Sequence, residues 1–186
     1  MTKPDTQLFM NAGTAIFACG CFWCLEAQFQ HLDGVLEIIP GFTGGHVPHP
    51  TYEQVCTGTT GHAEACKITF DAGKISYKQL LMAFFEAHDP TQLNRQGNDI
   101  GTQYRSALFY LDEEQHAEIE ACLELLTAQG VYDRPIVTQV CPATAFYPAD
   151  DYHKDYYNLH GDNPYCALVV QPKVKKFLRY LGKDFH

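Results

Sequence analysis

Two thiols and two aromatic rings stand together in the run from Gly20 to Cys24, where a predicted strand changes into a predicted helix. A thiol at the start of a helix faces unpaired backbone N–H groups and the positive end of the helix dipole. Both effects favour the thiolate, which is the nucleophilic form of cysteine. Phe22 and Trp23 would form an apolar wall with room for a small apolar group. The run therefore indicates either a reactive Cys21 beside a hydrophobic pocket or a buried helix cap with a core aromatic residue.

Glu64 is the carboxyl group best suited to acid chemistry. It stands in period-2 phase with the apolar residues of a predicted strand, Cys66, Ile68 and Phe70. In a strand, its side chain would therefore point toward the face that these residues bury. A desolvated carboxyl stays protonated to higher pH and can donate a proton near neutrality. The alternative is a solvated Glu64 at the strand end, with no role in chemistry.

The same cysteines allow two other interpretations. Cys21 and Cys24 have the Cys-x-x-Cys spacing of a thioredoxin-like redox pair. The two aromatic residues between the cysteines and the order of the predicted strands disfavour a thioredoxin-like fold. With Cys19 and a histidine such as His62, the two cysteines could instead hold a structural zinc ion. Zinc ribbons usually show a second Cys-x-x-Cys or a His-x₃₋₅-His, and the sequence has neither. It also lacks a phosphate-binding loop and a His-Glu-x-x-His motif.

Composition predicts one ordinary globular domain over residues 1–186. Hydrophobic residues make up 46% and charged residues 19%, and no change in composition marks a linker. The net charge of -9 argues against a nucleic-acid partner. No apolar run approaches the roughly 18 residues of a membrane span. The first residues contain no apolar signal region, so we expect a cytoplasmic protein whose eight cysteines stay reduced.

Apolar periodicity predicts the elements that must position the reactive side chains. Strands are expected over 14–18, 35–42, 62–70, 104–111 and 136–140. Helices are expected over 22–32, 77–85 and 112–129. The remainder, 142–186, is expected to be rich in loops, with one helix near Lys173. A basic cluster there, formed with Lys175 and Lys176, is interpreted as a solvated helix face. This order of elements is typical of an α+β fold with helices packed on a sheet, not of a doubly wound parallel sheet.

Several separated motifs resemble one known family, the A-type peptide methionine sulfoxide reductases. They cover about residues 14–166, in the family's order: GCFW at 20–23, GFTGG at 41–45, PTYEQV at 50–55, GTTGHAEA at 58–65, HDPTQLNRQGNDIGTQYRSALFY at 88–110 and DYHKDYY at 151–157. The resemblance implies a two-layer α+β sandwich with a ferredoxin-like core, here with a loop-rich C-terminal tail. It implies no metal or organic cofactor, and we expect a monomer.

The resemblance also implies a role for each matched residue. Cys21 would attack the sulfur of methionine-S-sulfoxide, free or in proteins, and become a sulfenic acid, while Glu64 would protonate the sulfoxide oxygen. The other pocket members would be Tyr52 and Tyr104 as hydrogen-bond donors to that oxygen, Asp99 as a further polar group, and Phe22 and Trp23 as the wall for the substrate methyl. A second thiol would then form a disulfide that thioredoxin reduces.

Two departures from the family pattern concern that second, resolving thiol. Cys24 stands where the family commonly has glycine, and of the C-terminal cysteine pair found in some members only Cys166 is present. We expect Cys166 to be the resolving thiol, because it follows a loop-rich segment that could swing toward Cys21 and because related enzymes place this thiol near the C-terminus. Cys24 is the rival, disfavoured if a tight helix aims it away from the pocket.

Overall fold

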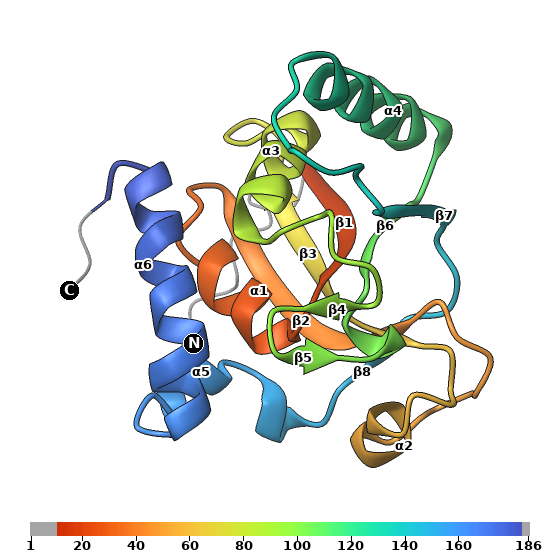
Figure 1. Cartoon of the computed structure of the whole chain (residues 1–186), viewed down its shortest axis with the longest axis vertical. Helices are drawn as coiled ribbons and strands as arrows, with labels where there is room; N and C mark the ends of the chain where they lie inside the picture. Colours follow the sequence, from red (N-terminus) through yellow and green to blue (C-terminus); the bar gives the residue numbers. More distant parts are fainter. Residues whose placement is uncertain (1–10, 184–186) are drawn as a thin grey trace, which may run out of the picture.

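The computed structural model describes residues 11–183, and a mixed six-stranded sheet forms the centre of this region (Figure 1). Its strands are β1 (Ala12–Cys19), β2 (Val35–Thr43), β3 (Ala63–Asp71), β6 (Ser106–Tyr110), β7 (Gln139–Pro142) and β8 (Tyr147–Pro148). Their order across the sheet is β7-β6-β1-β3-β2-β8. Neighbouring strands are antiparallel except β6 and β7, which are parallel. The fold is therefore mixed α/β.

Helices and short turns connect the strands. The α-helices are α1 (Phe22–Phe29), α2 (Tyr52–Cys56), α3 (Tyr77–Ala87), α4 (Glu113–Ala128), α5 (Tyr156–Leu159) and α6 (Gln171–Tyr180). Shorter elements include the paired strands β4 (Arg95–Gln96) and β5 (Asp99–Ile100), the 3₁₀ turns Thr102–Tyr104 and Asp151–His153, and a π-helical turn, Cys166–Val170. Thr51 and Ser76 each begin a helix with a capping box, and Asp112 accepts the N–H of Gln115.

Most predicted elements are confirmed, with shifted ends. The first three predicted strands are observed as β1, β2 and β3, and the fourth as β6. The fifth begins later than predicted, at Gln139, and the first helix ends earlier, at Phe29. The hairpin of β4 and β5 lies in a segment for which no strand is predicted, and α2 is not predicted because it is only five residues long. Such short elements carry too few residues for a periodic pattern.

The two faces of the sheet are covered by different parts of the chain. On β1, Phe17 and Cys19 belong to the main core, which also contains residues of α1, α3, α4 and α6. Ile16 and Ala18 point to the opposite face, where Phe146 packs against their cluster. Figure 1 shows α1, α3 and α6 together on one side of the sheet. The side chains at the N-terminal end of α1 are thus placed at the end of β1, on the helix-covered face.

The C-terminal region is more helical than predicted. Instead of a loop-rich tail with one helix, α5, the π turn and α6 occupy much of residues 156–180. On α6, Val174, Phe177 and Leu178 are buried at i, i+3 and i+4 spacing and pack toward α1. The expectation of a loop-rich tail is therefore wrong for this segment, because an apolar helix face docks it on the core.

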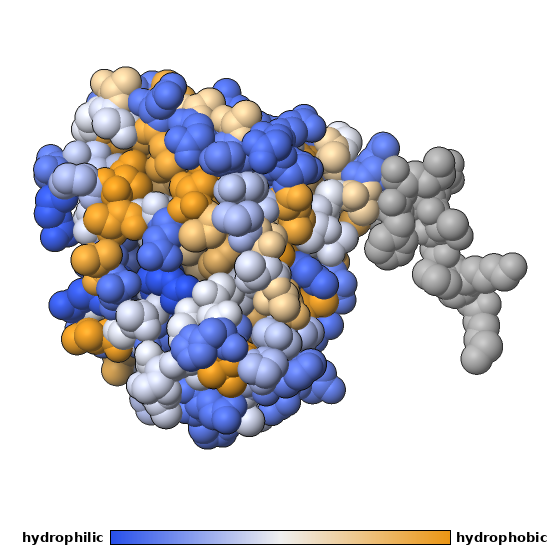
Figure 2. All heavy atoms as spheres, turned by 90° about the vertical axis from the view of Figure 1, so that its right-hand side faces the viewer, coloured by the Kyte–Doolittle hydropathy of each residue, from blue (hydrophilic) through white to orange (hydrophobic). Residues whose placement is uncertain are grey.

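The surface carries scattered hydrophobic residues. On the face shown in Figure 2, they gather in several spots separated by hydrophilic residues. Across residues 11–183, the large apolar side chains that are exposed come from many elements: Leu93, Ile100, Leu111, Leu125, Val131, Tyr152, Leu159, Leu168 and Tyr180. Within the same residues, no helix has both the length and the apolar composition needed to cross a bilayer.

Candidate active site

A sharp turn between β1 and α1 presents the predicted nucleophile. Gly20 has φ +100, and a Cβ there would lie 2.8 Å from the side chain of Gln96, so the turn requires glycine. Cys21 follows as the N-cap of α1, one position before the first helical residue. The N–H of Cys24 donates to the carbonyl of Cys21 at 3.1 Å. This four-residue turn brings the two cysteines together at the N-terminal end of the helix.

The two thiols are hydrogen-bonded to each other and buried, with Cys21 6% and Cys24 2% exposed. Burial raises the pKa of Cys21 well above its ordinary value of 9.0, and the contact with Cys24 raises it further. The pKa of Cys24 is lowered, chiefly because Cys21 donates its S–H to the Cys24 sulfur, with help from the Lys173 ammonium. We expected the helix terminus to make Cys21 the ionised thiol. Burial and the contact with Cys24 oppose the effect expected from the helix terminus at Cys21, while the same contact favours ionisation of Cys24.

Glu64 lies on β3, next to the same turn. Its side chain is 1% exposed, so the predicted burial is confirmed. Oε2 accepts the backbone N–H of Phe22 at 3.1 Å, which ties the carboxyl to the first residue of α1. Burial raises the pKa of Glu64 to about 8, and the charge of Asp99 adds to the shift, while the Phe22 N–H opposes it. The carboxyl therefore keeps its proton at neutral pH.

Tyr52 and Tyr104 bring two phenols to this carboxyl from different elements. Tyr52 is the first residue of α2, and Tyr104 ends a 3₁₀ turn. Burial raises the pKa of each phenol, and the charge of Glu64 is the second cause in both cases. Cys21 is a further cause for Tyr104. Both phenols remain protonated hydrogen-bond donors, and the structure brings them together with Glu64, as expected.

Asp99 is connected to the two thiols through Tyr165, a residue for which the sequence predicts no role. The Tyr165 hydroxyl donates to Oδ2 of Asp99 at 2.6 Å and also hydrogen-bonds with Cys21. Burial raises the pKa of Tyr165, and the nearby sulfurs of Cys21 and Cys24 raise it further. Asp99 and Tyr165 are separated by 66 positions in the chain. No spacing rule relates residues so far apart, so only the fold reveals this contact.

Aromatic rings surround the turn. Trp23 stacks on Tyr156 with ring centroids 3.7 Å apart and an angle of 6°, and its indole N–H donates to Nδ1 of His153 at 3.3 Å. The ring of Phe22 lies 5.5 Å from His153 and 6.3 Å from Tyr52. Burial lowers the pKa of His153, which favours the neutral imidazole that can accept from Trp23. Phe22 and Trp23 thus belong to an aromatic cluster beside Cys21, and the indole is fixed in position by a hydrogen bond.

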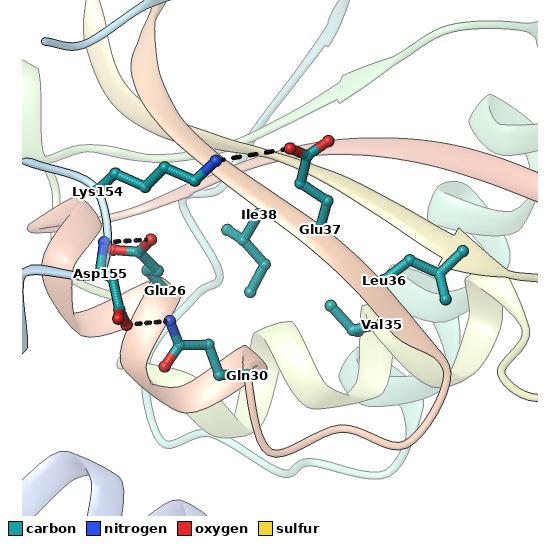
Figure 3. Close-up of a pocket in the computed structure, with 8 residues that line it drawn as sticks. All are labelled: Glu26, Gln30, Val35, Leu36, Glu37, Ile38, Lys154 and Asp155. Carbon is teal, nitrogen blue, oxygen red and sulfur yellow. Dashed lines mark hydrogen bonds and ion pairs between the residues drawn. The ribbon is translucent and has the colours of Figure 1, made fainter. Parts of the chain in front are cut away.

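A groove beside α1, shown in Figure 3, contains the bonds that hold part of this wall. Glu26 is 3% exposed and accepts the backbone N–H of Asp155 at 2.8 Å, and a further bond comes from the N–H of Tyr156. Gln30 donates to Oδ1 of Asp155 at 2.9 Å. Burial raises the pKa of Glu26 to about 7. These contacts attach the start of α5, and therefore the ring stacked on Trp23, to α1.

Cys166 is close to the thiol pair but is not on a loop. It begins the π turn, is 0% exposed, and belongs to the same buried cluster as Cys21 and Cys24. Burial raises its pKa, with a further contribution from Cys24. Cys166 therefore lies at the start of the helical stretch 166–180, and the segment that we expected to swing, 161–163, is a turn directly before it.

The zinc interpretation receives no support from the position of His62. Its Nδ1 accepts the N–H of Gly45 at 3.0 Å, and its Nε2 bonds the carbonyl of Val47 at 2.7 Å. Both ring nitrogens are therefore used to hold a neighbouring loop. Across residues 11–183, no group of three or more His, Cys, Asp or Glu side chains is arranged to hold a metal ion.

The sequence profile of the family described as peptide methionine sulfoxide reductase matches residues 13–184. The chain belongs to this family. It is 54% identical to the peptide methionine sulfoxide reductase MsrA of Saccharolobus solfataricus, over 86% of this chain and 89% of that protein. It is also 54% identical to MsrA of Thermus thermophilus, over 87% of this chain and 91% of that protein.

Solved structures of the same family share the fold. Mxr1 from Saccharomyces cerevisiae in its reduced form superposes with a TM-score of 0.79 and 31% identity, covering 88% of this chain and 92% of Mxr1. Methionine sulfoxide reductase A of Corynebacterium diphtheriae gives a TM-score of 0.71 and 34% identity, covering 82% of this chain and 76% of that one. The family of thiol-dependent reductases is thus favoured over a thioredoxin-like Cys-x-x-Cys oxidoreductase.

Proposed function

We propose that this protein reduces methionine-S-sulfoxide, free or within proteins, with Cys21 as the nucleophile and Glu64 as the acid. The observation that carries the proposal is the neutral carboxyl bonded to the N-terminus of α1, directly beside a buried thiol pair. Family membership supplies the substrate class, since its relatives are peptide methionine sulfoxide reductases.

The shared proton of the thiol pair offers a route to the Cys21 thiolate. Cys21 donates its S–H to the Cys24 sulfur, so transfer of that proton to an ionised Cys24 leaves the thiolate on Cys21. No proton needs to leave the buried site. The thiolate then attacks the sulfoxide sulfur, methionine is released, and the oxygen remains on Cys21 as a sulfenic acid.

A sulfoxide sulfur becomes a good electrophile only when its oxygen is protonated or strongly hydrogen-bonded. Glu64 supplies a transferable proton at neutral pH, and the phenols of Tyr52 and Tyr104 supply two further donors beside it. Asp99 fixes the Tyr165 hydroxyl next to Cys21. Phe22 and Trp23 provide the apolar surface for the substrate methyl group.

For the resolving thiol, the geometry favours Cys24 over Cys166. The N–H of Cys24 donates to the Cys21 carbonyl at 3.1 Å, which closes a β-turn. In such a turn the first and fourth Cα atoms, here those of Cys21 and Cys24, lie within roughly 7 Å of each other, the range that a disulfide needs. Cys24 also hydrogen-bonds with Cys21 directly, and this contact lowers the pKa of Cys24. Cys166 is buried and lies in helical structure just as Cys24 does, but the thiol that affects its ionisation is Cys24. Cys24 therefore replaces Cys166 as our first choice, and Cys166 becomes the rival.

Thioredoxin is the proposed reductant of the resulting disulfide. The yeast relative Mxr1 has been solved in complex with Trx2. A reducing compartment such as the cytoplasm, expected from the sequence, suits a chain whose eight cysteines are all free thiols. A monomer remains our expectation, and the scattered exposed apolar residues support it.

The core of the fold is proposed to be ferredoxin-like. Its support is the strand order β6-β1-β3-β2, in which all three pairings are antiparallel. The segments that connect these strands contain α1 between β1 and β2, and α3 between β3 and β6. That alternation is the split β-α-β arrangement of ferredoxin-like domains.

A direct assay tests the proposed activity. The protein is incubated with each epimer of methionine sulfoxide and dithiothreitol, and methionine is measured. We expect methionine from the S epimer, and loss of turnover in Cys21→Ser, because a hydroxyl there is not ionised near neutral pH. Cys141→Ser, a half-buried thiol on β7, is the matched control and should turn over normally. Substantial activity in Cys21→Ser would remove the proposed nucleophile.

A further inference from the structure

Lys173 of α6 contacts the thiol pair. Its sequence, next to Lys175 and Lys176, predicts instead a solvated basic face. Its Nζ lies 3.7 Å from Sγ of Cys24 and donates to it. The side chain is half-buried. Within residues 11–183, no carboxylate forms an ion pair with Lys173. The basic-face interpretation is therefore wrong for this residue, whose polar partner is a sulfur.

We propose that Lys173 is a positioning residue for the second half of the reaction, where it holds Cys24 as a thiolate facing the oxidised sulfur of Cys21. This inference rests on the proposed function and deepens it. The resolving step needs an ionised thiol, because the thiolate is the form that attacks sulfur.

The need for Lys173 arises after the first half of the reaction. In the reduced enzyme, the Cys21 S–H is the main group that stabilises charge on Cys24. Once Cys21 carries oxygen, that S–H no longer exists, whereas the ammonium of Lys173 is still in place. A cation 3.7 Å away in a desolvated site then becomes the principal support for the Cys24 thiolate.

The other groups around Cys24 do not substitute for this cation. Several groups interact electrostatically with the Cys24 sulfur. They are Cys19, Cys21, Glu64, Asp99, Tyr165, Cys166 and Lys173. The Asp99 carboxylate opposes ionisation of Cys24. The O–H of Tyr165 is already donated to Asp99, and Lys173 is the cation of this set.

Atoms and electrons balance in the proposed step. The Cys24 thiolate attacks the sulfur of the Cys21 sulfenic acid, the S–S bond forms, and the S–O bond breaks. The Cys24 thiolate forms when Cys24 gives up the proton that it took from Cys21 in the first half, and the oxygen leaves as hydroxide that takes up this proton to become water. Cys24 is oxidised and Cys21 is reduced to the disulfide level, so the methionine sulfoxide already consumed is the only oxidant required.

Single-turnover kinetics separate this role from a structural one. Reduced enzyme is mixed with one equivalent of methionine-S-sulfoxide without reductant, and methionine and free thiols are followed at several pH values. In Lys173→Met, methionine should form at the wild-type rate, while disulfide formation near pH 7 should be about tenfold slower and recover as pH rises. Lys173→Arg should retain most of the rate. Lys176→Met, an exposed lysine on the same helix, is the matched control.

Clear outcomes would overturn the inference. A Cys21–Cys24 disulfide that forms in Lys173→Met at the wild-type rate near pH 7 would do so, as would mass spectrometry that maps the wild-type disulfide to Cys21–Cys166. If Lys173→Met fails to fold, Lys173→Gln keeps a donor without the charge, and the same tenfold criterion applies to it. Failure of the proposed function has a different signature, since wild-type enzyme would then form no methionine.

Discussion

At the scale of single residues, opposite demands are met within one buried site. A nucleophile requires a thiolate, whereas a proton donor requires a neutral carboxyl, and burial disfavours charge on both. The site separates the two by giving Cys21 a sulfur partner that accepts its proton, while the hydrogen bond recorded for the Glu64 carboxyl within residues 11–183 comes from a single backbone N–H, that of Phe22. The carboxyl thus stays neutral, whereas the contact between the two thiols favours ionisation of Cys24.

Glu64→Gln tests this division at the residue scale. The raised pKa of about 8 means that the wild-type carboxyl is protonated below pH 8 and loses its proton as pH rises through that value. The single-turnover rate of methionine formation should therefore decline above about pH 8. In Glu64→Gln it should fall by roughly 10²–10⁴ at neutral pH, because the amide donates a hydrogen bond but no proton. Glu37→Gln is the control, because Glu37 forms a half-exposed ion pair with Lys154. A wild-type rate in Glu64→Gln would leave catalysis to the two phenols.

At the scale of elements, the turn from β1 into α1 is the part that sequence could predict. An apolar run, a glycine and a Cys-Phe-Trp-Cys run are local features, and the strand phase of Glu64 follows from alternation alone. The ionisation of the two thiols could not be predicted in this way. It depends on how deeply the turn is buried, and on Lys173 and Tyr165, which arrive from the far end of the chain. Contacts of this kind leave no periodic signal.

The link between α1 and α5 gives a prediction at this scale. The folded protein holds a proton on Glu26 up to about pH 7, whereas the unfolded chain releases it near the ordinary value of 4.5. Stability from this group is therefore complete below about pH 4.5 and is lost as pH rises to 7. Glu26→Gln cannot ionise, so its unfolding free energy relative to wild type should improve by roughly 1–3 kcal/mol between pH 5 and pH 8. Urea denaturation at both pH values measures this difference.

Glu26→Ala distinguishes charge from hydrogen bonding at the same position. It removes the acceptor for the N–H groups of Asp155 and Tyr156, so relative to Glu26→Gln, which also cannot ionise, it should cost about 1–3 kcal/mol at either pH. Equal pH dependence in wild type and Glu26→Gln would mean that Glu26 is already ionised in the folded protein at pH 5.

At the scale of the whole molecule, the coarse fold followed from the order of elements, but the role of the C-terminal segment did not. The spacing of Val174, Phe177 and Leu178 does mark a helix face. However, the sequence of this ten-residue helix does not indicate which surface of the molecule its apolar face covers. The fold places it on α1, so Cys166 and Lys173 join the thiol pair instead of moving freely in solvent. Because of this docking, Cys24 is favoured over Cys166 as the resolving thiol.

Phe177→Ala tests whether α6 belongs to the cooperative core. The Phe177 ring is 1% exposed and stacks on Phe29 of α1 at 5.9 Å and 16°. Truncating a buried phenylalanine removes its transfer free energy and leaves a cavity, so we expect a loss of about 3–5 kcal/mol in urea denaturation. Tyr180→Ala, on the same helix but 46% exposed, should cost less than about 1 kcal/mol. Because α6 also carries Lys173, the loss should be accompanied by slower disulfide formation at Cys21 and faster hydrogen exchange along α6. A Phe177→Ala protein as stable as Tyr180→Ala would show that α6 packs too weakly to fix Lys173 against Cys24.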